Sequence, residues 1–147
     1  MENRMTVRFA ALGVNESFAR SVAAAFAAHL DPTLEELTEI KTGVSEAVSN
    51  SIIHGYREDP EGIVEMECKV SEKRYITLII RDWGAGIEDV EKAREPMFTT
   101  GKPEERSGMG FTVMENFMDK LKVSSTVGKG TKVTMTKRLT VVSRMKG

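Results

Sequence analysis

Glu46-Ala47-Val48-Ser49-Asn50 is the stretch of sequence that best indicates the fold. It lies within a segment whose apolar residues recur at helical spacing, at Leu37, Ile40, Val44, Ala47 or Val48, and Ile52. This periodicity predicts a long amphipathic helix with one face in a core. Glu46 and Asn50 are one helical turn apart, so a carboxylate and an amide share the polar edge of that helix.

Two helices are predicted in this part of the chain. Thr33 and Glu36 form a capping-box pattern that predicts the start of the long helix, and Gly55 predicts its end. An earlier amphipathic helix is expected to begin at Asn15, a favourable N-cap residue, and to end near Asp31-Pro32. The two helices would then be joined by a short turn.

Alternation of apolar and polar residues predicts strands on both sides of these helices. One strand is expected from Met5 to Phe9, and a hairpin after the helices, joined by Ser71-Glu72-Lys73-Arg74. An irregular connection follows from Trp83 to Ser107, with a short helix near Glu88–Arg94. The last predicted elements are a helix from Phe111 to Leu121 and the strands Val123–Val127 and Thr131–Leu139.

The order of these elements defines the expected fold class. One strand, two helices, two strands, a long connection, one helix and two strands predict an α/β (α+β) two-layer sandwich. Its sheet would be mixed or mostly antiparallel, with helices on one face. Residues 1–147 are expected to form a single domain, because a chain of this length encloses one sizeable core.

The composition argues against several classes of protein. A net charge of −1 gives no basic field for nucleic acid or an anionic membrane. No uncharged apolar run approaches the ~20 residues of a membrane span, and no signal peptide is evident. The single cysteine, Cys68, cannot form an internal disulfide and fits a reducing compartment. We therefore expect a cytoplasmic protein without direct nucleic-acid or membrane contacts.

The polar edge of the long helix is a candidate metal and catalytic site. The side-chain oxygen of Asn50 is a hard, neutral ligand of the kind that Mg²⁺ accepts. The carboxylate of Glu46 could orient or deprotonate a nucleophile beside such a metal. His54 extends the row by another turn, although a helix C-terminus also favours histidine. The alternative for the pair is a solvated helix edge.

Asp82 stands at the end of an apolar strand and is a candidate base-binding residue. It has the strand parity of Leu78 and Ile80, so its carboxylate points to the core side, where an unpaired charge is costly. The exocyclic amine of a purine is a suitable donor to such a carboxylate. Gly84 and Gly86 would let the backbone approach the base closely. The alternative is a strand-ending aspartate in a turn.

Gly108-Met109-Gly110 precedes a helix and is a candidate phosphate site. A helix N-terminus offers free N–H groups and partial positive charge. The same connection contains hydroxyls and cations that can contact phosphates, in Thr99-Thr100-Gly101-Lys102 and Arg106-Ser107. Thr131 follows the turn Gly128-Lys129-Gly130 and could reach the pocket beside Asp82. Taken alone, the connection is a charged surface loop and Thr131 a hairpin residue.

Together and in this order, the four motifs resemble the N, G1, G2 and final Gly-Thr boxes of the GHKL ATPase/kinase superfamily. The sequence has no P-loop, dinucleotide-binding glycine motif, eukaryotic kinase motif or zinc cluster. The resemblance covers nearly the whole chain and implies the Bergerat ATP-binding fold. Within the superfamily, residues 44–55 and Pro96-Met97-Phe98-Thr99-Thr100 are most similar to small anti-sigma factor serine kinases of sporulating bacilli.

The resemblance implies a role for each matching residue. Glu46 would be the general base and Asn50 the Mg²⁺ ligand, under an ATP lid over residues 87–107. Arg20, on the first helix, would bind partners. The residues implied in binding ATP or ADP are Asn50, His54, Asp82, Gly84, Gly86, Ile87, Thr99, Lys102, Ser107, Gly108, Met109, Gly110 and Thr131.

The resemblance also implies partners and leaves alternatives open. Such proteins are homodimers that regulate transcription. They sequester a sporulation sigma factor of the sigma F type and phosphorylate a serine of an anti-anti-sigma protein. The alternatives are a general-stress anti-sigma kinase and a nucleotide-gated anti-sigma binder without kinase activity. A sensor histidine kinase domain would need a separate phosphoacceptor helix, and a topoisomerase-type or chaperone-type ATPase would need transducer domains.

Overall fold

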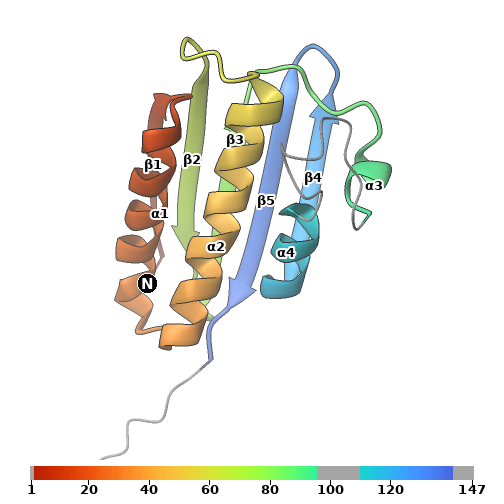
Figure 1. The fold of residues 1–147 in the computed structure, drawn as a ribbon. Helices are drawn as coiled ribbons and strands as arrows, with labels where there is room; N and C mark the ends of the chain where they lie inside the picture. Colours follow the sequence, from red (N-terminus) through yellow and green to blue (C-terminus); the bar gives the residue numbers. More distant parts are fainter. Residues whose placement is uncertain (1, 96–109, 141–147) are drawn as a thin grey trace, which may run out of the picture.

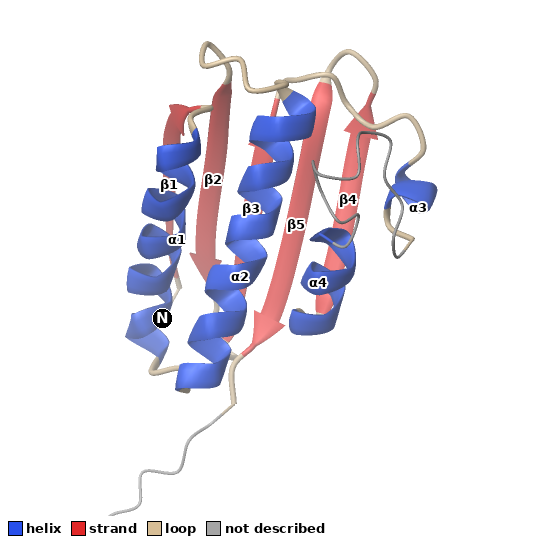
Figure 2. Cartoon of the chain, in the orientation of Figure 1, coloured by secondary structure: helices blue, strands red, loops and turns tan. Residues whose placement is uncertain are grey.

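The computed structural model describes residues 2–95 and 110–140, which form a two-layer α+β sandwich (Figure 1). A five-stranded sheet has the order β1-β2-β3-β5-β4, and all four strand pairings are antiparallel. Its strands are β1 Asn3–Ala10, β2 Ile63–Val70, β3 Tyr75–Asp82, β4 Lys120–Thr126 and β5 Gly130–Arg138. Helices α1, α2 and α4 cover one face (Figure 2). The predicted fold class is therefore confirmed.

The core lies between the sheet and the helices. Every second residue of β2 and β3 is buried, and neighbouring strands align these positions, as at Cys68, Leu78 and Met135. From the helical layer, Ile40, Val44 and Val48 of α2 are fully buried, as the apolar periodicity predicted. Burial raises the pKa of the Cys68 thiol to about 12, so this cysteine packs as a neutral apolar group.

Helix α1 spans Gly13–Ala27, and it begins two residues before the predicted start. The prediction that Asn15 caps this helix is wrong, because the N-cap is Leu12. Asn15 lies inside the first turn and donates its side-chain amide to the carbonyl of Ala10, at 3.0 Å. A short 3-10 turn continues the helix to Leu30, and Asp31 ends it in the left-handed region at φ 50°, as the sequence indicated.

Helix α2 spans Leu34–Asn50 and starts with the predicted capping box. The backbone N–H of Glu36 donates to the Thr33 hydroxyl, and the Thr33 N–H donates to the Glu36 carboxylate. After Asn50 the helix widens into a π-helical turn, Ser51–Gly55, before it ends at the predicted glycine. Such π turns arise where an extra residue is accommodated, and they are frequent at functional sites.

The C-terminal third of the fold has the predicted order of elements, but the last helix ends earlier than predicted and β4 begins earlier, at Lys120. The short helix α3 spans Val90–Ala93 and helix α4 spans Gly110–Phe117. Leu121 therefore belongs to β4 and not to the preceding helix, so its predicted place on the helix face is wrong. The apolar spacing was misleading because Leu121 and the helix both pack on the same core.

Of the described helices, none has the length and apolar character needed to cross a membrane.

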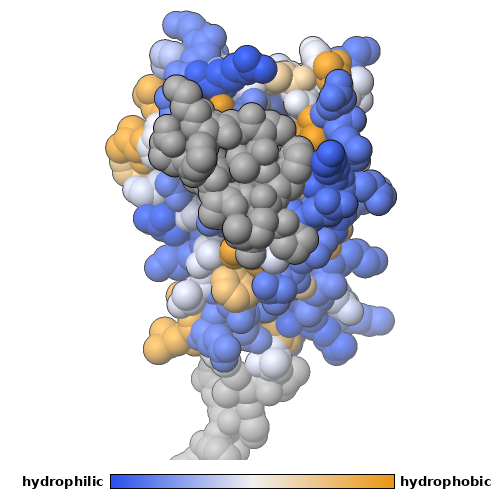
Figure 3. Space-filling model, turned by 45° about the vertical axis from the view of Figure 1, so that its right-hand side comes forward, coloured by the Kyte–Doolittle hydropathy of each residue, from blue (hydrophilic) through white to orange (hydrophobic). Residues whose placement is uncertain are grey.

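On the face seen in Figure 3, hydrophilic residues predominate among those described, and hydrophobic residues form small separate groups. Several large hydrophobic side chains are exposed among the described residues as a whole. The most exposed are Leu34, Val14, Val127 and Phe18. Single apolar residues of this kind are common on protein surfaces.

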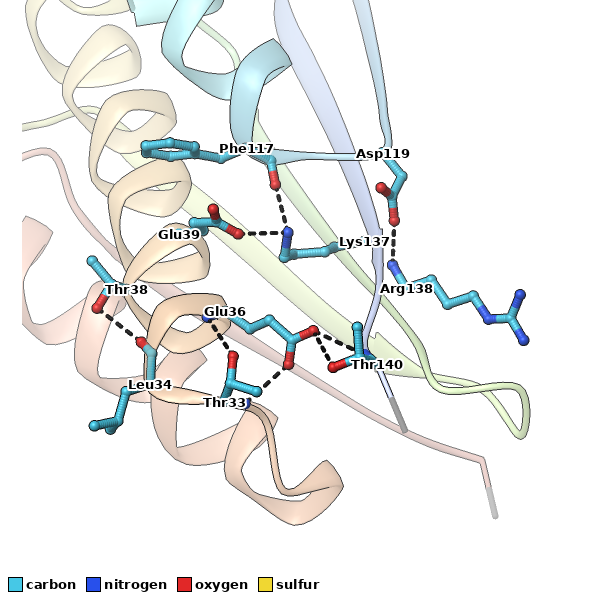
Figure 4. Close-up of polar contacts among 10 residues, drawn as sticks. All are labelled: Thr33, Leu34, Glu36, Thr38, Glu39, Phe117, Asp119, Lys137, Arg138 and Thr140. Atoms are coloured by element: carbon cyan, nitrogen blue, oxygen red, sulfur yellow. Dashed lines mark hydrogen bonds and ion pairs between the residues drawn. The ribbon is translucent and has the colours of Figure 1, made fainter. Parts of the chain in front are cut away.

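Two buried charged groups tie the start of α2 to the end of the sheet (Figure 4). The Glu36 carboxylate accepts hydrogen bonds from the backbone N–H and hydroxyl of Thr140, at 2.8 Å and 3.0 Å. The Lys137 ammonium of β5 lies 2.7 Å from the Glu39 carboxylate and donates to the Phe117 carbonyl at 2.8 Å. These contacts join α2, α4 and β5 at the end of the sandwich where α2 begins.

The hydrogen bonds at Glu36 determine the charge state of this buried carboxyl group. Burial on its own raises the pKa of Glu36, but the hydrogen bonds from Thr140 and Thr33 more than offset this effect. The net result is a pKa below the ordinary value of 4.5. A carboxyl group whose pKa is lowered by folding stabilises the native state above its unfolded-state pKa. That stabilisation is lost as the pH falls through the folded-state pKa.

We predict that Glu36→Gln lowers the free energy of unfolding at pH 7 by about 1–2 kcal/mol, because a neutral amide is a weaker acceptor for these bonds. Urea unfolding of variant and wild type at pH 7 and at acidic pH measures the difference. The deficit should shrink toward acidic pH, because the wild-type carboxyl group becomes protonated there. Glu35→Gln is the control, since Glu35 is exposed in the same turn. A pH-independent deficit would contradict the assignment.

Candidate functional site

The polar edge of α2 faces the first residue of α4. A Cβ atom placed on Gly110 would lie 3.1 Å from Glu46 Oε1 and 3.3 Å from Asn50 Nδ2. The structure thus brings Gly110 of the third sequence motif next to the first motif, in a contact that a side chain at position 110 would crowd. Gly110 is the first residue of α4, where backbone N–H groups have no partner within the helix. A carboxylate, an amide and a helix N-terminus therefore converge at one point.

Asp82, at the end of β3, is buried, with 4% of its surface exposed. Its Oδ2 atom accepts a hydrogen bond from the Ser51 hydroxyl at 2.8 Å. Its Oδ1 atom accepts from the backbone N–H groups of Gly84, at 3.0 Å, and Thr131, at 3.3 Å. The predicted inward orientation of this carboxylate is therefore observed. Its charge is balanced by donors from three separate segments.

The glycines after Asp82 allow backbone to pack against backbone. A Cβ on Gly84 would lie 2.2 Å from the Gly55 carbonyl oxygen. Gly86 has a φ of +81°, and a Cβ there would lie 2.3 Å from the Thr126 carbonyl oxygen. The sequence predicted close approach of a ligand to these residues. In the described structure, the close approach is that of neighbouring chain segments, which shape the surroundings of Asp82.

Thr131 is held beside Asp82 by a hydroxyl pair that sequence reasoning missed. Its Oγ1 atom lies 2.8 Å from the hydroxyl oxygen of Ser125 in β4. The Ser125 hydroxyl donates to the Gly130 carbonyl at 3.0 Å and accepts from the Ile87 N–H at 2.7 Å. Ser125 thereby places the predicted residues Thr131 and Ile87 at the same end of the sheet. Ser125 lies in a strand that looks exposed from its sequence, so nothing in the sequence indicated this role.

The π-helical turn after α2 contacts the Asp82 segment at several points. Besides Ser51, the Gly55 carbonyl accepts from the Ala85 N–H at 2.8 Å. The Tyr56 hydroxyl accepts from the Trp83 N–H at 2.7 Å and donates to the Ile63 carbonyl at 2.6 Å. Sequence reasoning missed Ser51 and Tyr56. Ser51 had one usable signal, since it falls on the buried side of the helix, four residues after Ala47.

Tyr56 keeps its hydroxyl proton in this position. Burial raises its pKa above the ordinary value of 10.0, and the negative charge of Asp82 raises it further. Hydrogen bonds with the backbone of Trp83 and Ile63 act in the opposite direction without reversing the shift. The neutral hydroxyl can therefore serve both as donor and as acceptor between two strand ends.

The other predicted residues fall into two groups. His54 is exposed in the π-helical turn, and Arg20 of α1 contacts Glu16, at 3.3 Å, and the Ser45 hydroxyl, at 3.0 Å. Arg20 thus touches the residue directly before Glu46. The described part of the expected lid is residues 87–95. The remaining predicted residues lie outside the described residues, and they are Thr99, Lys102, Ser107, Gly108 and Met109.

The described residues suit a metal held partly by a ligand. Among residues 2–95 and 110–140, no group of three or more His, Cys, Asp or Glu side chains is arranged to hold a metal ion. Mg²⁺ is usually held by one or two protein groups together with phosphate oxygens and water. Asn50, next to the start of α4, has the chemistry of such a protein group.

Comparison with known proteins identifies the family. Residues 9–137 match the histidine kinase-like ATPase domain. The chain is 60% identical to the anti-sigma F factor of Anoxybacillus flavithermus over 141 residues, covering 95% of each chain. It is 55% identical to the anti-sigma F factor of Clostridium novyi over 137 residues, covering 93% of this chain and 95% of that protein.

Solved structures support the same fold. The crystal structure of the RsbU and RsbW domains of Rv1364c from Mycobacterium tuberculosis matches 93% of this chain and 32% of that chain. The TM-score is 0.65 and the sequence identity 17%, so this likeness concerns the fold. The sequence matches extend over almost the full length of their relatives. The chain therefore belongs to the histidine kinase-like ATPase domains and, within them, to the family of the anti-sigma F factors.

Proposed function

We propose that this protein is an anti-sigma factor and an ATP-dependent protein-serine kinase. In this proposal it sequesters a sporulation sigma factor of the sigma F type and transfers the γ-phosphate of ATP to a serine of an anti-anti-sigma protein. The observation that carries the proposal is the convergence of Glu46 and Asn50 on Gly110 at the start of α4. The relatives named as anti-sigma F factors support the choice of a sporulation regulator over a general-stress regulator.

The described residues fit Mg²⁺ and ATP or ADP. Asp82 offers a buried carboxylate for the base, and the N-terminus of α4 offers N–H groups for phosphates. Asn50 lies between these two ends, because α2 carries it next to Gly110 and its neighbour Ser51 contacts Asp82. The absence of a side chain at Gly110 lets the start of α4 lie close to Glu46 and Asn50.

The proposed reaction is a direct phosphoryl transfer. ATP supplies the phosphoryl group: the serine oxygen bonds to the γ-phosphorus as the bond from that phosphorus to the bridging oxygen breaks, which releases ADP. Glu46 orients the serine hydroxyl and takes its proton as the new bond forms. Asn50 would hold Mg²⁺ through its neutral side-chain oxygen. Asp82 fixes the purine end, so the phosphates are presented to Glu46 in one orientation.

Partner binding is assigned to the outer face of the helical layer. Arg20 is half-buried, and one nitrogen of its guanidinium contacts both Glu16, at 3.3 Å, and Ser45, at 3.0 Å. A guanidinium placed in this way is a suitable recognition group for a carboxylate of a partner protein. Homodimer formation is part of the proposal, as the family resemblance implies.

We predict that Glu46→Gln lowers the rate of phosphotransfer at least about a hundredfold, because the amide cannot accept the serine proton. The affinity for ATP should stay within about threefold of wild type, which separates catalysis from binding. The assay uses γ-labelled ATP, Mg²⁺ and a candidate anti-anti-sigma protein, with Glu35→Gln as the matched control.

Two results of this assay would count against the kinase. Near-normal turnover in Glu46→Gln would exclude Glu46 as the base. Absence of label on the partner, despite tight binding of ATP and of the sigma factor by wild type, would favour the nucleotide-gated binder without kinase activity.

We predict that Asn50→Ala weakens ATP binding about tenfold in the presence of Mg²⁺, because the metal loses its protein ligand. In EDTA the variant and wild type should bind ATP equally, since no metal then bridges protein and phosphates. Calorimetric titrations with and without Mg²⁺ measure both affinities. An equal loss in both conditions would show that Asn50 contributes to folding or to direct nucleotide contacts instead.

We predict that Arg20→Ala weakens binding of the anti-anti-sigma protein about tenfold or more, because truncation removes the guanidinium. ATP affinity should not change. Binding is measured by titrating the labelled partner, with Arg8→Ala as a control, since Arg8 lies on β1 and pairs with Glu65. Unchanged partner affinity in Arg20→Ala would move the docking surface away from this part of α1.

A further inference from the structure

We propose that Ser51 is a specificity-determining residue that sets which nucleobase the site accepts. The inference rests on the proposed nucleotide site at Asp82 and concerns how that carboxylate is aimed. Ser51 is 5% exposed, and its hydroxyl donates to Asp82 Oδ2 at 2.8 Å. Both groups are buried, so this bond competes little with water.

The hydrogen bonds at Asp82 leave few acceptor positions on its carboxylate for a ligand. An ionised carboxylate only accepts hydrogen bonds, and it has about four acceptor positions. Oδ1 receives two backbone donors, from Gly84 and Thr131, which account for its two positions. Oδ2 receives the Ser51 hydroxyl, which leaves one acceptor position on that atom. A ligand in this site therefore meets one acceptor in a fixed direction.

This arrangement favours a base with an amino group and disfavours one with a carbonyl at the same place. The 6-amino group of adenine donates to the remaining position of Oδ2. A purine with oxygen at that position presents a second acceptor, which repels the carboxylate, and a purine with only hydrogen there leaves Oδ2 unsatisfied. The discrimination depends on the direction of the remaining lone pair, and Ser51 defines that direction.

Without the Ser51 hydroxyl, the carboxylate would lose this definition. The terminal torsion of an aspartate side chain is broad, and only its hydrogen bonds fix it. Rotation about the Cβ–Cγ bond moves both oxygens together, and without Ser51 only the two bonds to Oδ1, at 3.0 Å and 3.3 Å, would resist it. Oδ2 would then adapt to the base present, and the preference for an amino group would fall.

Ser51 also connects base recognition to the catalytic end of the site. It directly follows Asn50 and is the first residue of the π-helical turn. The same turn also contacts the segment that follows β3, because the Ala85 N–H donates to the Gly55 carbonyl. Because α2 carries Glu46, the Asp82 carboxylate that receives the nucleobase is fixed relative to the residue proposed to accept the serine proton.

The experiment compares two ligands that differ only in the amino group. Dissociation constants of ATP and purine riboside 5′-triphosphate, which has hydrogen at position 6, are measured by calorimetry with Mg²⁺. Wild type, Ser51→Ala, Ser51→Thr and Ser71→Ala are compared, where Ser71 lies in the distant β2–β3 turn. The readout is the dissociation constant of purine riboside 5′-triphosphate divided by that of ATP. A partly unfolded sample does not change this ratio.

We predict that Ser51→Ala lowers this ratio about tenfold, because the hydrogen bond that aims a charged acceptor is lost. Ser71→Ala should keep the wild-type ratio, and Ser51→Thr should restore most of it through its hydroxyl. A wild-type ratio in Ser51→Ala, or a loss of affinity equal for both ligands, would overturn the role of Ser51 and leave the nucleotide site standing. Absence of ATP binding by the wild-type protein would overturn both proposals.

Discussion

The buried carboxylate of Asp82 is the group on which the geometry of the candidate site depends. Its hydrogen bonds join the π-helical turn, the segment after β3 and the start of β5, which are far apart in sequence. A charge with 4% exposure is tolerable only because these donors replace its hydration. The same bonds bring the end of α2 onto the end of β3. The same hydrogen bonds therefore determine both where the end of α2 lies on the sheet and which way the carboxylate points.

A buried carboxylate joins helix to sheet at each end of the sandwich, and the two ends differ in their other contacts. At the end where α2 begins, side-chain charges join helix to sheet, with Glu36 bound to Thr140 and Lys137 bound to Glu39. At the other end, the Asp82 carboxylate accepts from Ser51, and backbone also packs on backbone, since Gly84 and Gly55 approach each other without side chains between them. Because α2 is fixed at both ends, the positions of Glu46 and Asn50 on its polar edge are set by the sheet.

Much of this architecture could be predicted from the sequence because its determinants are local. The alternation in β2 and β3, the capping box at Thr33 and the final glycine of the π turn each act within a few residues. The parity of Asp82 with its strand also predicted correctly that the carboxylate points inward. The features that escaped prediction depend on partners distant in sequence.

Asn15 and Ser51 show why these features were missed. Asn15 has the chemistry of an N-cap, but the helix already begins at Gly13. The side-chain amide of Asn15 instead donates to the Ala10 carbonyl. Ser51 is an ordinary helix residue by propensity. Its importance comes from Asp82, 31 positions away, and from the widened turn that ends α2. A local pattern cannot encode either contact.

The place of Arg20 bears on how nucleotide state and partner binding are connected. The Arg20 guanidinium, on α1, contacts Ser45 of α2, and the next residue is Glu46, so the proposed docking group touches the turn of α2 that carries the proposed catalytic group. Proximity alone does not couple two sites, because a nucleotide changes partner affinity only if it binds the two states differently. A rigid α2 restricts where such a difference can arise. The change must then lie in elements whose position α2 does not fix.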